Sequence, residues 1–532
     1  MASSPIVPPG GQFPIPATLS TPLLAFRCAP AIRPYLPEDV SSPAGIIIDT
    51  PITQNDIADA SSISLPAHAD PTLTPLVVTV SLNGHTLAEG LVPLNASKVE
   101  LPFSLKSAGL KPQTEAYNLS CTASFSTLTG KTQKFTTSTM LSFLPDPPPG
   151  RSVTKMDLRT GALMAKPANG AKGDYETVFP IGFYTSFGDY LATNLSVLND
   201  LKARGKYFVT VYNILLISHK VHPIPTFDNL TALEEVLDRM EEQGLYLMYD
   251  MRWTYMNSTA VTEEVNRIKN RPNLLLWYTG DEPDGTSDPL NATSNAYDLI
   301  YSLDGYHPVS LVLNCENYFF TQYTAGTDIV MQDTYMIGNN VTTPCTLDYG
   351  DCGCDNCKGV FEDISTRMDE FAERLWDSGW DRTKAVWAAP QAFGDDTYWK
   401  VVPTGQEYVL QSVLAINHGG LGVFGWDDPT TDDIKASATL LAQALLTMKD
   451  FILSPAASFN LVIQDRIHVG LWTVGLKTLL LGTNLNNASA TFDLADVHGL
   501  GGKVTQVLDT GAKLSKGSVV FESVGSGGFV FG

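Results

Sequence analysis

Residues 274–285 read LLLWYTGDEPDG: an apolar run leads into two adjacent acids, Asp281 and Glu282, and then into Pro283. A short continuous apolar run bounded by turn residues is typical of a strand that is buried on both faces, as in a parallel sheet. Proline lacks the N–H that a sheet ladder needs, so regular pairing ends there. The stretch therefore predicts a buried parallel strand with two carboxylates at its carboxyl end.

Seven further strands alternate with amphipathic helices between about Tyr175 and Leu453, which predicts a parallel α/β architecture. The expected strands span residues 178–186, 207–216, 246–253, 274–283, 309–317, 328–337, 385–394 and 420–429. The expected helices lie near residues 190–203, 233–244, 259–270, 292–303, 359–378, 405–417 and 433–451. Eight units in about 280 residues predict a (β/α)8 TIM barrel. A doubly wound open sheet is the alternative.

The flanking regions read differently, as short β-type runs between turn clusters. We expect an N-terminal β-sandwich over residues 1–149, which ends at the stiff proline-rich stretch PDPPPG, and a linker over residues 150–172. The barrel is expected over residues 173–453 and a small C-terminal β-sandwich over residues 454–532. The sequence thus predicts a multidomain α/β plus β chain.

The composition narrows the range of partners. The chain has 532 residues, of which 44% are hydrophobic and 17% charged, and a formal net charge of −22. Nucleic acids and anionic membranes would be repelled by such a chain, so we expect neither as a partner. No apolar run is long enough for a spanning helix. A neutral or cationic ligand, bound by a monomer or small homo-oligomer, fits this charge better.

Cysteines and glycosylation motifs point to export. Of seven cysteines, Cys345, Cys352, Cys354 and Cys357 crowd one loop. Two disulfides there are favoured over zinc, because a zinc site would need a second, equally spaced pair. Cys28 and Cys121 are expected to form a third bridge, with Cys315 free and buried.

Asn-X-Ser/Thr acceptors occur at Asn95, Asn118, Asn194, Asn229, Asn257, Asn291, Asn340 and Asn487. Together these features predict a secreted, extracellular, fungal-type glycoprotein with N-linked glycans.

The carboxyl ends of barrel strands converge on one mouth, where activity in this fold is found. The expected mouth is rich in acids, amides and aromatic rings, and it lacks His and Lys. Such side chains suit a neutral polyol, because acids and amides hydrogen-bond hydroxyls and aromatic faces pack on sugar rings. The expected substrate-binding residues are Tyr184, Tyr212, Asn213, Asp250, Arg252, Trp253, Asn314, Tyr335, Gln391, Trp426 and Asp427. Arg252 could instead serve only as the partner of Asp250.

Three motifs, FPIGFYTSFGDYL, WYTGDEP and GVFGWDD, together resemble the barrel glycoside hydrolases. In that superfamily the general acid is a Glu at the end of strand four, within an Asn-Glu-Pro or Asp-Glu-Pro sequence. The resemblance covers the middle domain and implies that Glu282 is the proton donor of an O-glycosidase acting on a polysaccharide or glycan, without a metal or other cofactor. The neighbouring Asp281 would raise the pKa of that acid.

The chain departs from the commonest pattern at strand seven, where the resemblance implies a nucleophilic Glu and the sequence has Gln391 in APQAFG. Another mouth carboxylate, Asp333, Glu316 or Asp427, could serve as nucleophile at about 5 Å from Glu282, or as base at about 6.5–9.5 Å. Alternatively, the Asp281–Glu282 pair resembles that of the substrate-assisted hexosaminidases, with Tyr335 as a hydrogen-bonding partner. Asp281 could also be structural. A non-catalytic carbohydrate-binding or cell-wall protein is the competing class.

Overall fold

The computed structural model describes residues 11–65, 75–126, 132–205, 208–212, 227, 229–338, 357–395, 399–497 and 500–532. Eight parallel strands close into a barrel in chain order, which confirms the predicted (β/α)8 architecture and excludes the open sheet. The barrel strands are β15 (Ile181–Ser186), β16 (Phe208–Tyr212), β17 (Tyr246–Asp250), β18 (Leu274–Asp281), β19 (Val309–Leu313), β20 (Ile329–Gln332), β21 (Ala385–Ala388) and β22 (Val423–Asp428).

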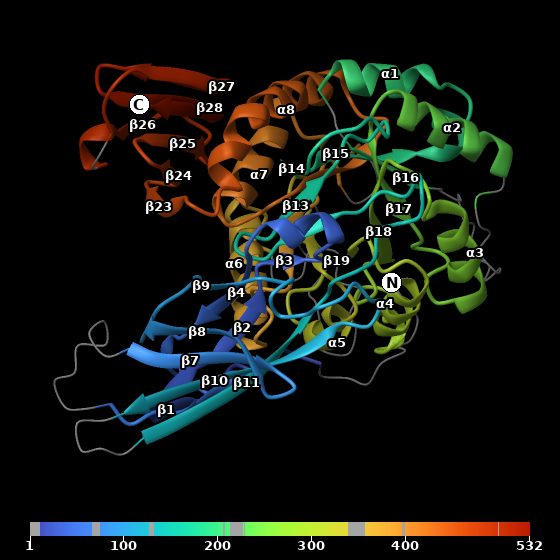
Figure 1. Ribbon diagram of the computed structural model, residues 1–532. Coiled ribbons are helices and arrows are strands. Elements are labelled where there is room, and N and C mark those ends of the chain that lie inside the picture. Colours follow the sequence, from blue (N-terminus) through green and yellow to red (C-terminus); the bar gives the residue numbers. More distant parts are fainter. Residues whose placement is uncertain are drawn as a thin grey trace.

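Helices surround this barrel, and two of them match the sequence expectation at both ends (Figure 1). They are α1 (Ser196–Ala203), α2 (Leu230–Glu242), α3 (Ser258–Ile268), α4 (Ala292–Leu303), α5 (Phe320–Ala325), α6 (Glu362–Asp377), α7 (Gly405–Asn417) and α8 (Asp432–Ile452). The helix α5 was not expected, because its six residues are too few to carry a clear helical period. It joins β19 to β20 as a short crossover.

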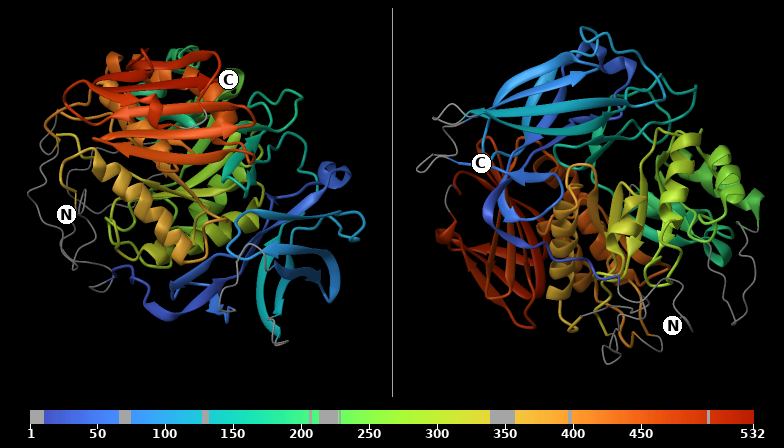
Figure 2. Two further views of the ribbon diagram at one scale, coloured as in Figure 1. Left: turned by 90° about the vertical axis from the view of Figure 1, so that its left-hand side faces the viewer. Right: turned by 90° about the horizontal axis from the view of Figure 1, so that it is seen from below.

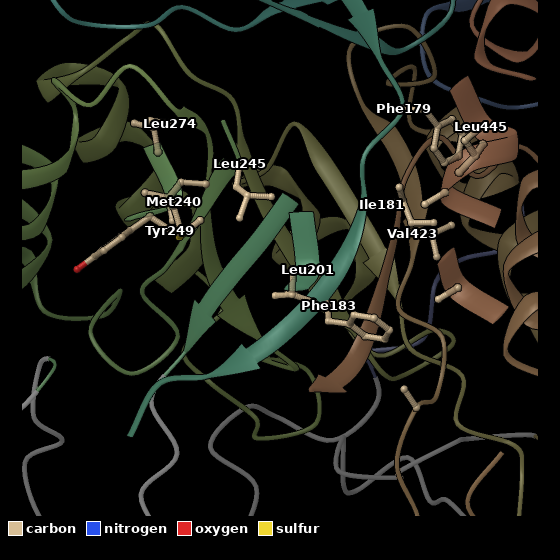
Figure 3. Close-up of a cluster of buried hydrophobic side chains, with 14 of the residues drawn as sticks. Phe179, Ile181, Phe183, Leu201, Met240, Leu245, Tyr249, Leu274, Val423 and Leu445 are labelled. Carbon is tan, nitrogen blue, oxygen red and sulfur yellow. The ribbon is translucent and has the colours of Figure 1, made fainter. Parts of the chain in front are cut away.

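Residues 274–281 form β18, which is buried along its apolar length. Trp277 faces the helix layer, where its Nε1 donates to Asp304 over 2.9 Å, whereas Tyr278 belongs to the cluster inside the barrel. The layer between strands and helices is one large apolar cluster. Figure 3 shows part of it, with Leu201 from α1 beside Phe183 from β15, and Leu445 from α8 beside Phe179. Burial on both faces explains why this strand reads as an unbroken apolar run.

The N-terminal region contains β-sheets that pack around a common apolar core. One sheet has the order β11-β10-β7-β8 and another the order β2-β4-β9. Their strands are β7 (Pro75–Leu82), β8 (His85–Pro93), β10 (Tyr117–Ser126), β11 (Thr132–Leu141), β2 (Arg27–Pro30), β4 (Ala44–Asp49) and β9 (Val99–Phe103). A disulfide between Cys28 and Cys121 joins the two sheets, and Cys315 is a buried thiol that forms no disulfide, both as predicted.

A third small sheet, β5-β1-β6, completes this region. Its strands are β1 (Thr18–Ala25), β5 (Ile52–Asn55) and β6 (Ala60–Ser62). A four-stranded sheet, β14-β13-β12-β3, then leads into the barrel. It is built from β3 (Ile32–Arg33), β12 (Lys155–Asp157), β13 (Ala162–Ala165) and β14 (Glu176–Val178), so the expected linker carries two strands.

The N-terminal region is anchored at the end of the barrel where the strands begin. Arg33 binds Asp328, directly before β20, over 2.7 Å, and Arg382, shortly before β21, binds Asp49 over 2.8 Å. Figure 2 shows this region against one side of the barrel, apart from the C-terminal region. The sheets of this region thus lie away from the mouth, whereas the segment before β1 reaches the loop after β19, where Gly11 accepts from the N–H of Phe319 over 2.6 Å.

The C-terminal region is a six-stranded antiparallel sheet with the path β23-β24-β25-β28-β26, to which β27 adds by pairing with β28. Its strands are β23 (Ser458–Gln464), β24 (Ile467–Val474), β25 (Lys477–Asn484), β26 (Ala490–Asp493), β27 (Val504–Ser515) and β28 (Ser518–Phe531). A small β-sandwich was expected here; the region is β-rich, and all its described strands are hydrogen-bonded into one sheet. It packs on α7 and α8, and Asn417 ties it to the barrel by donating to the carbonyl of Leu481 over 3.0 Å.

Candidate active site

The mouth of the barrel is built by residues that follow the strands, and Glu282 stands directly after β18. Its φ of 52° lies in the left-handed region, where a β-carbon is unfavourable. Its N–H donates to the carbonyl of Val312 on β19 over 3.2 Å, and its carbonyl accepts from the N–H of Thr286 over 2.9 Å. These contacts hold Glu282 at a fixed place, half-buried at the edge of the mouth.

Asp333 follows β20, two strands away, and its carboxyl hydrogen-bonds the carboxyl of Glu282. The side chain is buried, with only 2% of the residue exposed. Burial, together with the negative charge of Glu282, raises the pKa of Asp333 well above its ordinary value. Two carboxyls in hydrogen-bond contact hold one proton between them, because one must donate to the other. The mouth thus contains a proton-sharing acid pair.

Asp281 belongs to a second group, which is centred on Arg252. The guanidinium donates to Asp281 Oδ2 over 2.6 Å and to Asp250 over 2.8 and 2.6 Å, and the Tyr278 hydroxyl donates to Asp281 Oδ1 over 2.5 Å. Arg252 and Asp250 are both buried, whereas the Asp281 side chain is 28% exposed. At neutral pH two carboxylates and one guanidinium leave one negative charge, held in place on the open side; burial raises the pKa of Asp250 to about 6, so this charge falls off below that pH. The pairing of Arg252 with Asp250 follows the simpler of the two sequence interpretations.

Aromatic rings form the floor beneath these charges. Tyr184 is 1% exposed and lies edge-on to Tyr278 with ring centres 5.5 Å apart, and Trp426 covers it at 5.1 Å. The Arg252 guanidinium lies 4.6 Å from the centre of the Trp426 ring. Trp253 is 42% exposed and is the open aromatic face in this part of the mouth. Tyr184 therefore supports the floor, and the two tryptophans remain accessible to a ligand.

A second aromatic group stands beside the acid pair. The ring of Tyr335 lies 5.0 Å from Phe393 and 6.0 Å from Trp399, in edge-to-face contact. The Trp399 indole N–H donates to the carbonyl of Tyr335 over 3.0 Å. Tyr335 is itself close enough to Asp333 and Glu282 for their charges to raise the pKa of its hydroxyl, after burial as the main cause. Both sides of the mouth thus offer apolar ring surface next to carboxyl groups.

Other candidates stand apart from the acid pair. Gln391 is fully buried, and its amide exchanges hydrogen bonds with the main chain of Ile337 at 3.0 and 2.9 Å. Its polar atoms hold a loop and are not offered to a ligand. Glu316 hydrogen-bonds Glu370 on α6 and lies 3.6 Å from Arg374, which places it in a separate cluster. Burial and the Glu316 charge raise the pKa of Glu370 to about 7.

Four further residues were expected at the mouth, and the structure describes only two of them in full. Asn314 is 2% exposed, and its side-chain oxygen accepts from the Cys315 thiol over 3.1 Å. Asp427 is half-buried after a cis peptide bond with Trp426. Tyr212 ends β16, but its side chain and the whole of Asn213 lie outside the described residues, as do Cys345, Cys352 and Cys354. Cys357 is disulfide-bonded.

Sequence reasoning missed Asp284, which organises the loops around the acid pair. The residue is fully buried, and its carboxylate accepts from the N–H groups of Gly285, Asn314 and Cys315 at 2.9, 3.3 and 2.8 Å. It therefore joins the loop after β18 to the loop after β19. The signal was the Asp-Gly pair after Pro283, because Asp in a turn accepts hydrogen bonds from nearby main-chain groups.

Neither a metal cluster nor a membrane helix is found in the described part of the chain. No group of three or more His, Cys, Asp or Glu residues there could hold a metal ion. No helix among the same residues is long and apolar enough to cross a membrane.

No family model matches the chain, and no curated protein matches it in sequence. Solved structures do resemble it. A family 39 glycoside hydrolase from the gut symbiont Bacteroides cellulosilyticus is 12% identical with a TM-score of 0.43, over 86% of this chain and 95% of that one. A structure described as a glycoside hydrolase is 12% identical with a TM-score of 0.48, over 72% and 96% of the two chains. A family 30 endoxylanase from Clostridium papyrosolvens is 10% identical with a TM-score of 0.39, over 67% and 97%. All three are glycoside hydrolases. Likeness at this distance leaves function to be argued from the residues of the mouth.

Proposed function

We propose that the chain is an O-glycoside hydrolase in which Glu282 and Asp333 cleave the glycosidic bond. The observation that carries the proposal is the hydrogen bond between their carboxyls at the mouth of the barrel, with Asp333 buried. Glycosidic cleavage needs one carboxylic acid and one carboxylate on either side of the scissile bond. Two carboxyls that share one proton supply a carboxylic acid and a carboxylate at the same pH.

The roles follow from the exposure of the two residues. Glu282 is the more accessible and stands at the strand-four position, so it protonates the leaving oxygen and later takes the proton from water. Asp333 lies deeper and holds the shared proton in the free protein, because burial and the charge of Glu282 raise its pKa. Transfer of that proton to Glu282 makes Glu282 the acid and leaves Asp333 as the carboxylate that supports or attacks the anomeric carbon. Carboxyls in hydrogen-bond contact are nearer than the roughly 5–5.5 Å of retaining enzymes and much nearer than the roughly 6.5–9.5 Å of inverting ones. The smaller departure is from the retaining separation, so we propose retention of configuration.

The surrounding residues suit a sugar that becomes positively charged in the transition state. The group of Asp250, Arg252 and Asp281 carries one net negative charge beside the pair. An oxocarbenium-like transition state is stabilised by such a fixed charge. Trp253 and Trp399 offer ring faces on which a sugar can pack.

A substrate-assisted hexosaminidase is the second candidate, and the anchoring of Asp281 favours it. The Asp281 carboxylate is held by Arg252 and Tyr278 and still has 28% of its side chain exposed, next to Glu282. A carboxylate fixed in this way could orient a 2-acetamido group that attacks the anomeric carbon. This candidate requires a 2-acetamido sugar, whereas the first does not.

Secretion and N-glycosylation, in a fungal-type cell, complete the proposal. Two observations support export: the disulfide between Cys28 and Cys121 and the disulfide at Cys357. Disulfides persist in oxidising compartments and are rare in the cytosol. We also keep the expectation of a monomer or small homo-oligomer.

A screen on polysaccharides and aryl glycosides tests the proposed function, with Glu282→Gln and Asp333→Asn as blanks. Glu316→Gln is the matched control, because Glu316 follows the neighbouring strand but pairs with Glu370 instead. We expect the first two changes to abolish turnover and the third to retain it. Cleavage of 2-acetamido substrates alone would favour the hexosaminidase. Tight glycan binding without product would instead support a carbohydrate-binding protein.

A further inference from the structure

The asparagines of the Asn-X-Ser/Thr motifs share an exposed position. Seven of the eight motifs fall on described residues, and the asparagine is exposed in every one of them. They are Asn95, Asn118, Asn194, Asn229, Asn257, Asn291 and Asn487. Asn340 lies outside the described residues. An attached glycan is bulky and needs an open surface, so each of the seven meets the first requirement.

The side-chain hydrogen bonds that four of these asparagines make with described residues all use the oxygen of the amide. Oδ1 of Asn95, Asn194, Asn229 and Asn257 accepts from the main-chain N–H of Ile52, Ser196, Ala232 and Thr259, at 3.2, 3.1, 3.0 and 3.0 Å. Among the described residues, none of the seven asparagines makes a hydrogen bond through Nδ2. By contrast, the asparagines whose Nδ2 donates are Asn273, Asn417, Asn484 and Asn486, and none of them begins a motif. The nitrogen that would carry a glycan is therefore left available, and modification keeps Oδ1 as an acceptor.

Four of the seven stand in neighbouring positions around the mouth. Asn229, Asn257 and Asn291 directly precede α2, α3 and α4, and Asn194 lies two residues before α1. In a (β/α)8 barrel each helix begins at the end where the preceding strand finishes. These four asparagines consequently border the mouth over the first four βα units, on the side that carries Glu282.

Helix capping alone does not account for this arrangement. Asparagine is a preferred N-cap, and Asn229 and Asn257 do cap their helices. Asn291, however, makes no capping hydrogen bond, and a cap requires no hydroxyl residue two positions later. Thr231 and Thr259 complete two of the motifs and are exposed on the first turns of their helices. Helix capping therefore explains the asparagine of these motifs but not the hydroxyl residue two positions later.

We propose that Asn194, Asn229, Asn257 and Asn291 carry N-linked glycans that form a crescent along one side of the barrel mouth. In the transfer, C1 of the sugar in a lipid-diphosphate oligosaccharide bonds to Nδ2, which loses one proton, and the lipid diphosphate leaves. The crescent covers the rim of the first four units, so a large glycan reaches the acid pair from the opposite side. The proposal rests on the proposed secretion of the chain and stands independently of the hydrolytic activity.

Mass spectrometry of the full chain secreted by yeast cells tests the proposal. Release of N-glycans by an amidase in heavy-oxygen water converts each modified Asn to labelled Asp, and tryptic peptides report each site. We expect label at all four positions and none at Asn273 or Asn417. Unlabelled, unmodified peptides at these four positions in the secreted protein would overturn the proposal.

Matched variants separate the glycan from the helix cap. Thr231→Ala removes the motif and leaves the Asn229 cap, whereas Thr231→Ser keeps both. We expect the first variant to lose the mass of one glycan with its thermal midpoint unchanged, and the second to retain the parental mass. A Thr231→Ala protein with the same mass as its parent would show that Asn229 carries no glycan.

Discussion

Replacing Asp333 with asparagine should raise the free energy of unfolding at neutral pH, although the residue is buried at the centre of the proposed site. Asp333 and Glu282 share a hydrogen bond and hence one proton, so full ionisation of the pair is opposed in the folded protein. The amide of an asparagine donates to Glu282 permanently and carries no charge. The variant therefore removes a repulsion while keeping the contact.

The size of the gain follows from the distance between the charges. Two carboxylates about 4 Å apart repel by about 4 kcal/mol at an effective dielectric constant of 20, which is the upper limit of the effect. The protein avoids much of this cost by retaining the proton, at about 1.4 kcal/mol for each unit of raised pKa. We expect a net stabilisation of about 1–3 kcal/mol, because solvation of the half-exposed Glu282 reduces the repulsion.

The pH dependence gives the sign of the effect. A carboxyl with a raised pKa binds more protons in the folded than in the unfolded chain, so its contribution is largest at low pH and is lost as pH rises through the folded pKa. Asp333→Asn has no titrating carboxyl at this position, so its free energy of unfolding does not fall in this way as pH rises. The difference between variant and parent should therefore be small near pH 4 and should grow toward pH 7.

Urea unfolding followed by near-ultraviolet circular dichroism at pH 4 and pH 7 measures this difference. Asp284→Asn is the matched control, because the carboxylate of Asp284 accepts three main-chain N–H groups and its replacement should destabilise the chain. The reasoning is refuted if Asp333→Asn is less stable than the parent at pH 7, or if the difference does not change with pH.

Three further predictions concern other parts of the chain. Arg252→Met should cost about 3–5 kcal/mol in urea unfolding, because it leaves the carboxylate of Asp250 buried without a partner; a loss below about 1 kcal/mol would contradict the ion-pair description. The double variant Cys28→Ser and Cys121→Ser should lower stability by about 2–4 kcal/mol, measured by the same method, and an unchanged midpoint would show that the bridge contributes nothing. Burial lowers the pKa of His468 to about 4, so the folded chain should lose stability as pH falls from about 6.5 to 4, and His468→Gln should flatten that part of a pH–melting curve. A parallel decline in parent and variant would contradict this assignment.

The barrel was predictable because its strands and helices carry strong and regular patterns. β18 reads as an apolar run since it is buried on both faces, and α4 and α7 matched at both ends. The α7 boundary is marked by a capping box at Thr404 and Glu407. The short helix α5 lacked such signals. Local pattern therefore defined the long elements and missed the shortest.

The site was predictable only as a set of residues at strand ends. Glu282 and Asp333 were both on that set, but their contact spans two strands and depends on how far each side chain reaches inward. Gln391 was on the set as well, yet its amide turns to the main chain of Ile337, because an unpaired buried amide is costly. Asp284 was absent from this set because it lies in the loop beyond the end of the strand, where the alternation of strands and helices predicts no position at the mouth. Which mouth residues meet is a property of packing.

The dependence of cleavage on the leaving group tests the central claim most directly, namely that Glu282 is the acid and Asp333 its partner. On a substrate that the parent cleaves, Glu282→Gln and Asp333→Asn are compared for a dinitrophenyl glycoside, whose leaving group needs no proton, and for the matching alkyl glycoside. We expect Glu282→Gln to reduce the first-turnover release of dinitrophenol little and alkyl cleavage by about 10²–10⁴-fold, and Asp333→Asn to reduce both. Equal losses on the two substrates for Glu282→Gln, or parental rates for Asp333→Asn, would contradict the account.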